Sequence, residues 1–205
     1  MNDGTPSLST EDNVSTYGIQ SSQKVGPSIA DDIKRDAVLA VLFSLVGIFL
    51  YILMRFRNVS YSLGAVASLA HDTLIIMGLY SLLYSIMPFS MEVDQSFIAA
   101  ILTIIGYSIN DTVVVFDRVR ELRTLYPNRP IAETINDAVN ATLVRTFSTS
   151  FSTFVVLLVI FLLGGETIRG FVFALMLGVI AGTISTLFVA VPIAYDASKQ
   201  KQVKA

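Results

Sequence analysis

The feature that most constrains this chain is a series of five long apolar runs, at about 37–54, 63–84, 95–116, 143–163 and 168–195. Each run is close to the ~20 residues that an α-helix needs to cross the hydrocarbon core of a bilayer. Charged residues make up 15% of the chain, well below the ~25% of typical soluble domains. The sequence therefore predicts an all-α polytopic membrane protein, a bundle of five transmembrane helices.

The basic residues of the connections and of the C-terminal tail indicate how the helices are oriented. They are Arg55, Arg57, Arg118, Arg120, Arg123, Arg129, Lys199, Lys201 and Lys204. The alternate connections, 85–94 and 164–167, contain no lysine or arginine. Because cytoplasmic loops of membrane proteins are enriched in lysine and arginine, we expect an extracytoplasmic N-terminus and a cytoplasmic C-terminus.

The longest predicted cytoplasmic segment, 117–142, contains its own helical pattern. Pro130 suits a first helical position, and Ile131, Ile135 and Val139 recur at helical spacing. This pattern predicts a short amphipathic helix on the cytoplasmic membrane surface. A packed loop helix with no function of its own is an equally good interpretation.

An acidic residue inside the third run and a basic residue in the fourth are the strongest candidate site. At ~1.5 Å per residue, Asp111 lies about 24 Å from the outer end of its helix and Arg145 about 27 Å from the outer end of the next. A carboxylate at hydrocarbon depth costs roughly 2.5–3.5 kcal/mol, so it indicates a functional site. We predict that Asp111 and Arg145 form a proton relay; a static ion pair that only joins two helices is the alternative.

Further polar residues would support this relay. Asn110 and Thr112 flank Asp111, Thr149 follows Arg145 by one helical turn, and Asp72 offers a second intramembrane carboxylate. The last run contains Ala174, Gly178 and Gly182 at a spacing of four, and small residues at this spacing let another helix approach closely. We predict that these three residues pack against a neighbouring helix.

Several classes of function are not supported by the sequence. Cysteine is absent and there is a single histidine, His71, so a metal site is not expected. No nucleophile elbow, phosphate-binding loop or zinc-protease motif is present. We expect no enzyme activity, no cofactor and no nucleic-acid partner.

The motifs in order resemble those of SecF, the second half of the SecDF protein-export membrane proteins in the resistance-nodulation-division superfamily. The central block is 106–121, which contains the Asn110-Asp111-Thr112 triplet. Val25-Gly26-Pro27, His71-Asp72, Arg145-Thr146, Thr149-Ser150 and Gly164-Gly165-Glu166 also match, so the resemblance runs from about 25 to 195.

The resemblance implies a function and a set of partners. SecF-like proteins assist the Sec translocon in the bacterial cytoplasmic membrane, using the proton-motive force and no cofactor. Their partners are a SecD-like half, the translocon channel, the preprotein and the bilayer. In the family the Asp and Arg of the matching motifs lie on the proton path, which implies that role for Asp111 and Arg145.

The resemblance also implies a domain organisation. Residues 1–24 would be a polar extracytoplasmic segment, a candidate remnant of a periplasmic domain. Residues 25–196 would form the SecF-like transmembrane domain and 197–205 a cytoplasmic tail. The first span and the extracytoplasmic domain of a SecF-like unit are missing, so we expect part of a fused protein or a truncated product. The alternatives are a small-molecule or lipid exporter fragment of the same superfamily and a non-transporting membrane scaffold.

Overall fold

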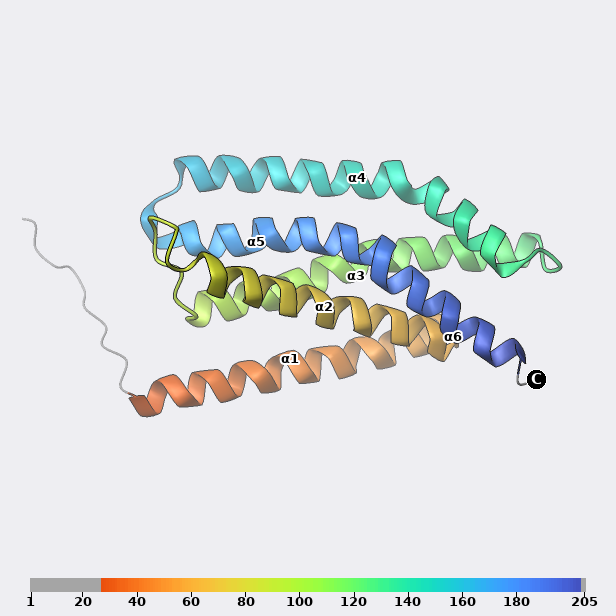
Figure 1. The fold of residues 1–205 in the computed structure, drawn as a ribbon, viewed down its shortest axis with the longest axis horizontal. Helices are drawn as coiled ribbons and strands as arrows, with labels where there is room; N and C mark the ends of the chain where they lie inside the picture. Colours follow the sequence, from red (N-terminus) through yellow and green to blue (C-terminus); the bar gives the residue numbers. More distant parts are fainter. Residues whose placement is uncertain (1–26, 204–205) are drawn as a thin grey trace, which may run out of the picture.

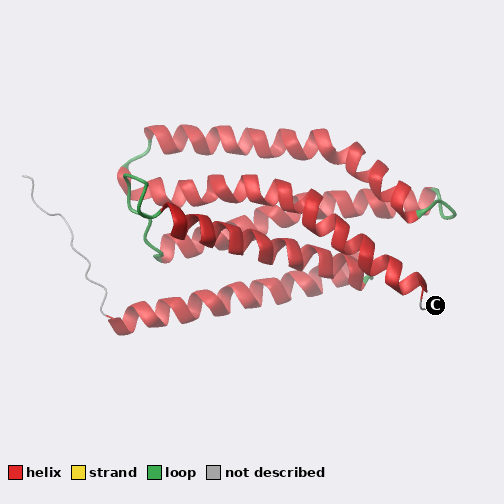
Figure 2. Ribbon diagram, viewed as in Figure 1, coloured by secondary structure: helices red, strands yellow, loops and turns green. Residues whose placement is uncertain are grey.

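Helices make up almost all of the chain that the structure describes. In the computed structural model, which describes residues 27–203, the helices are joined by short loops and no strand is present in this range (Figure 2). Their bounds are α1 Pro27–Phe56, α2 Val59–Leu83, α3 Gln95–Leu125, α4 Ile131–Leu163, α5 Glu166–Ser185, the π-helix η1 Thr186–Ala190 and α6 Val191–Val203.

The described range holds five helical stretches that are long and apolar enough to cross a membrane, with α5, η1 and α6 together forming the fifth. They run side by side and alternate in direction (Figure 1). The five predicted apolar runs fall on these helices, so the predicted all-α membrane fold is confirmed. The predicted extracytoplasmic segment, 1–24, lies outside the described residues.

Local sequence accounts for where the helices begin and end. The Asn58 side chain accepts a hydrogen bond from the Ser60 backbone N–H at 3.0 Å, and the Asp94 side chain accepts one from Phe97 N–H at 2.9 Å. These bonds satisfy backbone donors that a helix leaves free at its start. Between α1 and α2 the chain reverses over two residues, and Arg57 there has a positive φ of 52°.

The predicted short amphipathic helix is formed, but it is not separate. Its residues are the first turns of α4, which continues without a break from Ile131 to Leu163. No proline or glycine interrupts the sequence between these residues, so nothing ends the helix before the apolar run begins. α4 bends in its N-terminal third instead (Figure 1).

The bundle has two different ends. The arginine-rich end carries the α1–α2 and α3–α4 connections, where Arg55 forms an ion pair of 3.0 Å with Asp117. Arg129 lies within 3.2 Å of Glu133 and 2.7 Å of Asp137, and these hydrogen bonds raise the pKa of its guanidinium. The opposite end carries the loop 84–94 and the Gly164-Gly165 connection.

Two apolar clusters fill the interior. The cluster toward the arginine-rich end includes Phe56, Tyr61 and Phe116, whose rings are 4.8–6.1 Å apart. The cluster toward the opposite end includes Ile76 and Ile101. α3 passes from one cluster to the other between Ile105 and Val115, and the buried polar residues of α3 lie in that stretch.

Candidate functional site

Two carboxylates are buried inside the bundle. Asp72 on α2 is 0% exposed and Asp111 on α3 is 5% exposed, and both helices are long and apolar enough to span a membrane. Hydroxyl groups from four elements surround them, all buried except that of Thr183, which is half-buried. We call this set the polar layer; its members are Asp72, Ser108, Asp111, Thr112, Ser150, Thr183 and Thr186.

Asp72 has a strong hydrogen-bond donor. Ser108 Oγ donates to Asp72 Oδ2 at 2.7 Å, which joins α2 to α3. His71 Nδ1 lies 3.4 Å from Asp72 Oδ1, although adjacent residues on a helix point about 100° apart. A Cβ on Gly182 would lie 3.0 Å from Ser108 Oγ, so the glycine allows α5 to approach α3 beside this bond.

Asp111 is held less tightly. Ser150 Oγ on α4 donates to Asp111 Oδ2 at 3.4 Å, a distance at which a hydroxyl–carboxylate bond is weak. Thr183 Oγ1 on α5 donates to Ser150 Oγ at 2.6 Å. The Asp111 carboxylate is therefore the end of a hydroxyl chain that connects α3, α4 and α5.

A second hydroxyl pair lies on the next residue of α3. Thr112 Oγ1 and Thr186 Oγ1 are 3.0 Å apart, and both residues are fully buried. Thr186 begins the π-helix η1, in which Val191 N–H donates to the Thr186 carbonyl. Single π-helical turns occur often at functional sites, and this one adjoins the residue that follows Asp111.

Asp111 and Arg145, the two residues of the predicted proton relay, do not form a direct ion pair in the described range, and their relay role stays a prediction. No ion pair of 4.0 Å or less is formed by either residue within the part of the chain whose side chains the structure places. The buried face of α4 is formed by Thr142, Thr146 and Ser150, at a spacing of four. Arg145 is one residue from Thr146 and is therefore turned by about 100° to the exposed face.

The predicted supporting residues have different positions. Asp72 and Thr112 are buried in the polar layer, but neither bonds to Asp111. Asn110 and Thr149 are exposed. The Thr149 hydroxyl donates to the backbone carbonyls of Arg145 and Thr146, at 3.1 and 2.9 Å. Their part in a relay stays a prediction.

The predicted packing residues are all buried, as the small-residue spacing suggests. Ala174 lies in the apolar cluster toward the opposite end of the bundle. A Cβ on Gly178 would collide with the side chain of Ile104 on α3, and Gly182 adjoins Ser108 as described above. These residues allow the close packing of α5 on α3.

Three members of the polar layer were missed by sequence reasoning, namely Ser150, Thr183 and Thr186. A signal for Ser150 was available, because Thr142, Thr146 and Ser150 form a hydroxyl row at a spacing of four in an apolar run. Among the residues that the structure describes, no group of three or more His, Cys, Asp or Glu side chains is arranged to hold a metal ion.

Fold and site together define a class: a polytopic helical membrane protein whose helices meet around intramembrane carboxylates. Comparison with known proteins identifies the family. Residues 7–200 match the family described as "Protein export membrane protein SecD/SecF, C-terminal". The chain belongs to this family.

Relatives and solved structures agree with this assignment. The chain is 51% identical to the protein translocase subunit SecF of Rhodothermus marinus over 84% of this chain and 56% of that protein. It is 44% identical to the protein translocase subunit SecDF of Brucella abortus, over 86% of this chain and 22% of that protein. The crystal structure of SecDF from Thermus thermophilus, titled a translocon-associated membrane protein, has a TM-score of 0.75 and 40% identity, covering 85% of this chain and 23% of that one.

The matched proteins are longer than this chain. The chain spans about half the length of the SecF relative and under a quarter of the SecDF proteins. The family and the transmembrane fold are therefore common to all of them, whereas the activity of the whole relatives belongs to longer proteins.

Proposed function

We propose that this chain is the SecF-type transmembrane part of a protein-export auxiliary that uses the proton-motive force to assist preprotein translocation. The observation that carries the proposal is Asp111, a carboxylate buried at membrane depth with one weak hydrogen bond. The names of the relatives, protein translocase subunits, support the substrate class. The work of such a unit is transport, with no covalent chemistry on the preprotein.

Asp111 suits a proton-coupling role because its surroundings fix neither protonation state. A carboxylate that serves structure alone is normally held by an arginine or by several short hydrogen bonds. Among the side chains that the structure places, Asp111 accepts one hydrogen bond, the 3.4 Å bond from Ser150. Burial favours the neutral form of a carboxyl, whereas a nearby cation favours the charged form. A movement that changes the distance between Asp111 and Arg145 would therefore take up or release a proton.

The driving force is adequate for such a step. The membrane potential supplies about 2.3 kcal/mol per elementary charge per 100 mV. A two-state change shifts its populations about tenfold for every 1.4 kcal/mol. One proton that crosses the full potential would therefore bias such a change substantially.

Arg145 indicates where a partner half would bind. Its guanidinium lies on the exposed face of α4 together with Thr149, which is one helical turn away. An arginine facing lipid is unfavourable, so a protein surface with its own acidic or polar groups would be the better neighbour. We propose that a SecD-like half packs on this face of α4. The SecDF relatives, which carry both halves in one protein, support a partner of this kind.

The setting follows from the same reasoning. We propose that the arginine-rich end lies in the cytoplasm, that the membrane is the bacterial cytoplasmic membrane, and that the C-terminus is cytoplasmic. The translocon channel and the preprotein would be further partners of the complete protein. The loops without lysine or arginine support the orientation.

The test compares two carboxylates of α3 in the full-length protein. Asp111→Asn removes the titratable group and keeps the shape of the side chain, whereas Asp117→Asn makes the same change at an exposed carboxylate near the arginine-rich end. Export of a secreted preprotein is measured at imposed proton gradients, with the membrane level of each variant measured in parallel. We expect Asp111→Asn to be present at normal level and to lose the response to the gradient, and Asp117→Asn to keep it.

Two results would contradict the proposal. If Asp111→Asn still responds to the gradient, Asp111 does not couple protons. If its membrane level falls and the remaining protein responds normally, the carboxylate is structural, as in a non-transporting scaffold.

A further inference from the structure

The opposite end of the bundle has a groove whose mouth carries a few polar groups and whose interior is apolar. The mouth, of about 480 Å³, lies between α2 and the loop 84–94 and is lined by residues that include Ser81, Tyr84 and Glu92. A second hollow of about 180 Å³ lies deeper, between α1, α2 and α3. Both are lined by Met77, Val93 and Phe97, so the two hollows adjoin, and we refer to them together as the groove.

The deep part is apolar throughout. α1 contributes Ala37, Val38, Val41 and Leu42, and α3 contributes Ile98 and Ile101. Thr73 is the one residue with a side-chain polar group there, and its hydroxyl donates to the Leu69 carbonyl at 2.9 Å. α1 diverges from α2 toward its first residue, which leaves this space between them (Figure 1).

The deep part lies within spanning helices, where the surrounding solvent is lipid hydrocarbon. A space lined by carbon at that depth is filled by an acyl chain, because water would find no hydrogen-bond partner. The deep part of the groove, which we call the trough, does not select one lipid, because the acyl chains of all lipids are as apolar as its walls. Selection must come from the mouth, where the head group would lie.

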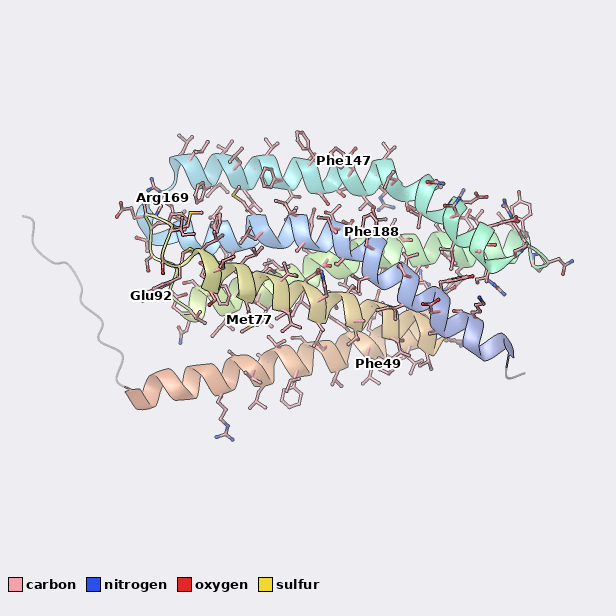
Figure 3. All side chains as sticks on the ribbon, viewed as in Figure 1. Phe49, Met77, Glu92, Phe147, Arg169 and Phe188 are labelled. Atoms are coloured by element: carbon pink, nitrogen blue, oxygen red, sulfur yellow. The ribbon has the colours of Figure 1, made fainter. Side chains whose placement is uncertain are left out.

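The mouth is acidic. The loop 84–94 contains no lysine or arginine, and Glu92 is exposed with no ion-pair partner among the side chains that the structure places. The Asp94 carboxylate is engaged in capping α3. Arg169 lies at the same end beside the α4–α5 connection and does not line the groove (Figure 3). Figure 3 also labels Met77 and Glu92, which mark the interior and the mouth.

We propose that this groove binds one phospholipid with a primary ammonium head group, the class of phosphatidylethanolamine, in the leaflet at the opposite end of the bundle. Its ammonium group pairs with the Glu92 carboxylate. The Ser81 and Tyr84 hydroxyls donate to the phosphate, and one acyl chain lies along α1 in the trough. An anionic head group without an amine is disfavoured because Glu92 would repel it.

The experiment uses the full-length protein in bilayer discs that contain equal amounts of phosphatidylethanolamine and phosphatidylglycerol. Native mass spectrometry after release from the discs measures which lipid stays bound. Glu92→Gln removes the charge, and Glu166→Gln makes the same change at an exposed acid of this end outside the groove. Ala37→Trp fills the trough, and Val46→Trp places the same side chain on an exposed part of α1 that does not line the groove.

We expect one retained phosphatidylethanolamine. Its preference over phosphatidylglycerol should fall by about two- to fivefold in Glu92→Gln, as for one partly exposed charge pair, and stay unchanged in Glu166→Gln. Ala37→Trp should lose the retained lipid, and Val46→Trp should keep it. Equal retention of both lipids by the unaltered protein, or an unchanged preference in Glu92→Gln, overturns the proposal.

A photocrosslinking residue at position 98 distinguishes a lipid from a protein occupant. A crosslink to a phospholipid supports the proposal. A crosslink to another segment of the full-length protein overturns it, because a helix would then fill the trough.

Discussion

The contact of α2 with the last helix gives the sharpest prediction of stability, at Gly64. A Cβ at this position would collide with the Ala190 carbonyl oxygen, at the end of the π-helix η1. It would also lie 3.1 Å from Ala194 Cβ and 3.2 Å from Ala194 N. All three obstacles are backbone atoms or a Cβ, so no change of rotamer relieves the collision. Gly64→Ala must push α2 away from the last helix.

The matched change Gly78→Ala isolates the cost of that collision. Gly78 lies on the same helix, and a Cβ there meets nothing within 4 Å. Any gain in helix propensity, up to about 1 kcal/mol for Gly to Ala, is common to both variants and cancels in their difference. Forcing extra atoms into a packed interior costs about 1–3 kcal/mol. The two variants should therefore differ by about 1–3 kcal/mol in the free energy of unfolding, with Gly64→Ala the less stable.

The difference can be measured by titrating the full-length protein in mixed micelles with sodium dodecyl sulfate. The fraction of native protein is followed by resistance to a protease. Since 1.4 kcal/mol is a tenfold change in an equilibrium constant, the expected difference is about five- to 150-fold in the folding equilibrium. Equal midpoints for the two variants would show that α2 does not approach Ala190 this closely, and the reasoning would be refuted.

Three further changes test other contacts with the same titration. Gly178→Ala should destabilise the fold through its collision with the Ile104 side chain. When Ile104→Ala is combined with it, the double variant should lose less stability than the sum of the two single losses; additive losses would contradict the contact. Ser108→Ala leaves the buried Asp72 carboxylate without its 2.7 Å donor and should lower the free energy of unfolding by about 1–3 kcal/mol. A typical hydrogen bond contributes at least roughly 0.5 kcal/mol, so a smaller loss would show that the bond is unimportant. Asp117→Asn breaks an exposed ion pair and should cost less than about 1 kcal/mol; a larger loss would mean that the pair is more buried than the structure indicates.

The transmembrane architecture was predictable because each span carries its own signal. A run of about 20 apolar residues satisfies its backbone only as a helix in a bilayer, so the five spans follow from local sequence. Outside the membrane the spacing of Ile131, Ile135 and Val139 predicted a helix but not that it would join the apolar run that follows. α4 begins at Ile131, twelve residues before its apolar run, because the polar turns before it are compatible with the same helix.

The contacts between helices were only partly predictable. Burial of Asp111 followed from its place in an apolar run, and Gly178 and Gly182 of α5 lie against Ile104 and Ser108 of α3. The partner of Asp111 depends on how α4 is rotated about its axis. A rotation of about 100° exchanges Arg145 for Thr146 on the buried face, and depth along the helix, on which the Asp111–Arg145 prediction relied, does not contain that information.

The last helical stretch, formed by α5, η1 and α6, connects the polar layer to α2, α3 and α4. Before η1, Gly178 and Gly182 fix α5 against α3; after it begins, Ala190 lies against Gly64 of α2. Between these contacts Thr183 donates to Ser150, which in turn donates to Asp111, and Thr186 pairs with Thr112. The Ser150–Asp111 bond is the longest bond between two side chains of the layer, so we expect a movement of Asp111 to break it before the threonine pair or the glycine contacts. Because this bond comes from α4, we expect α4, the helix that carries Arg145, to separate from Asp111 more easily than α5 separates from α3.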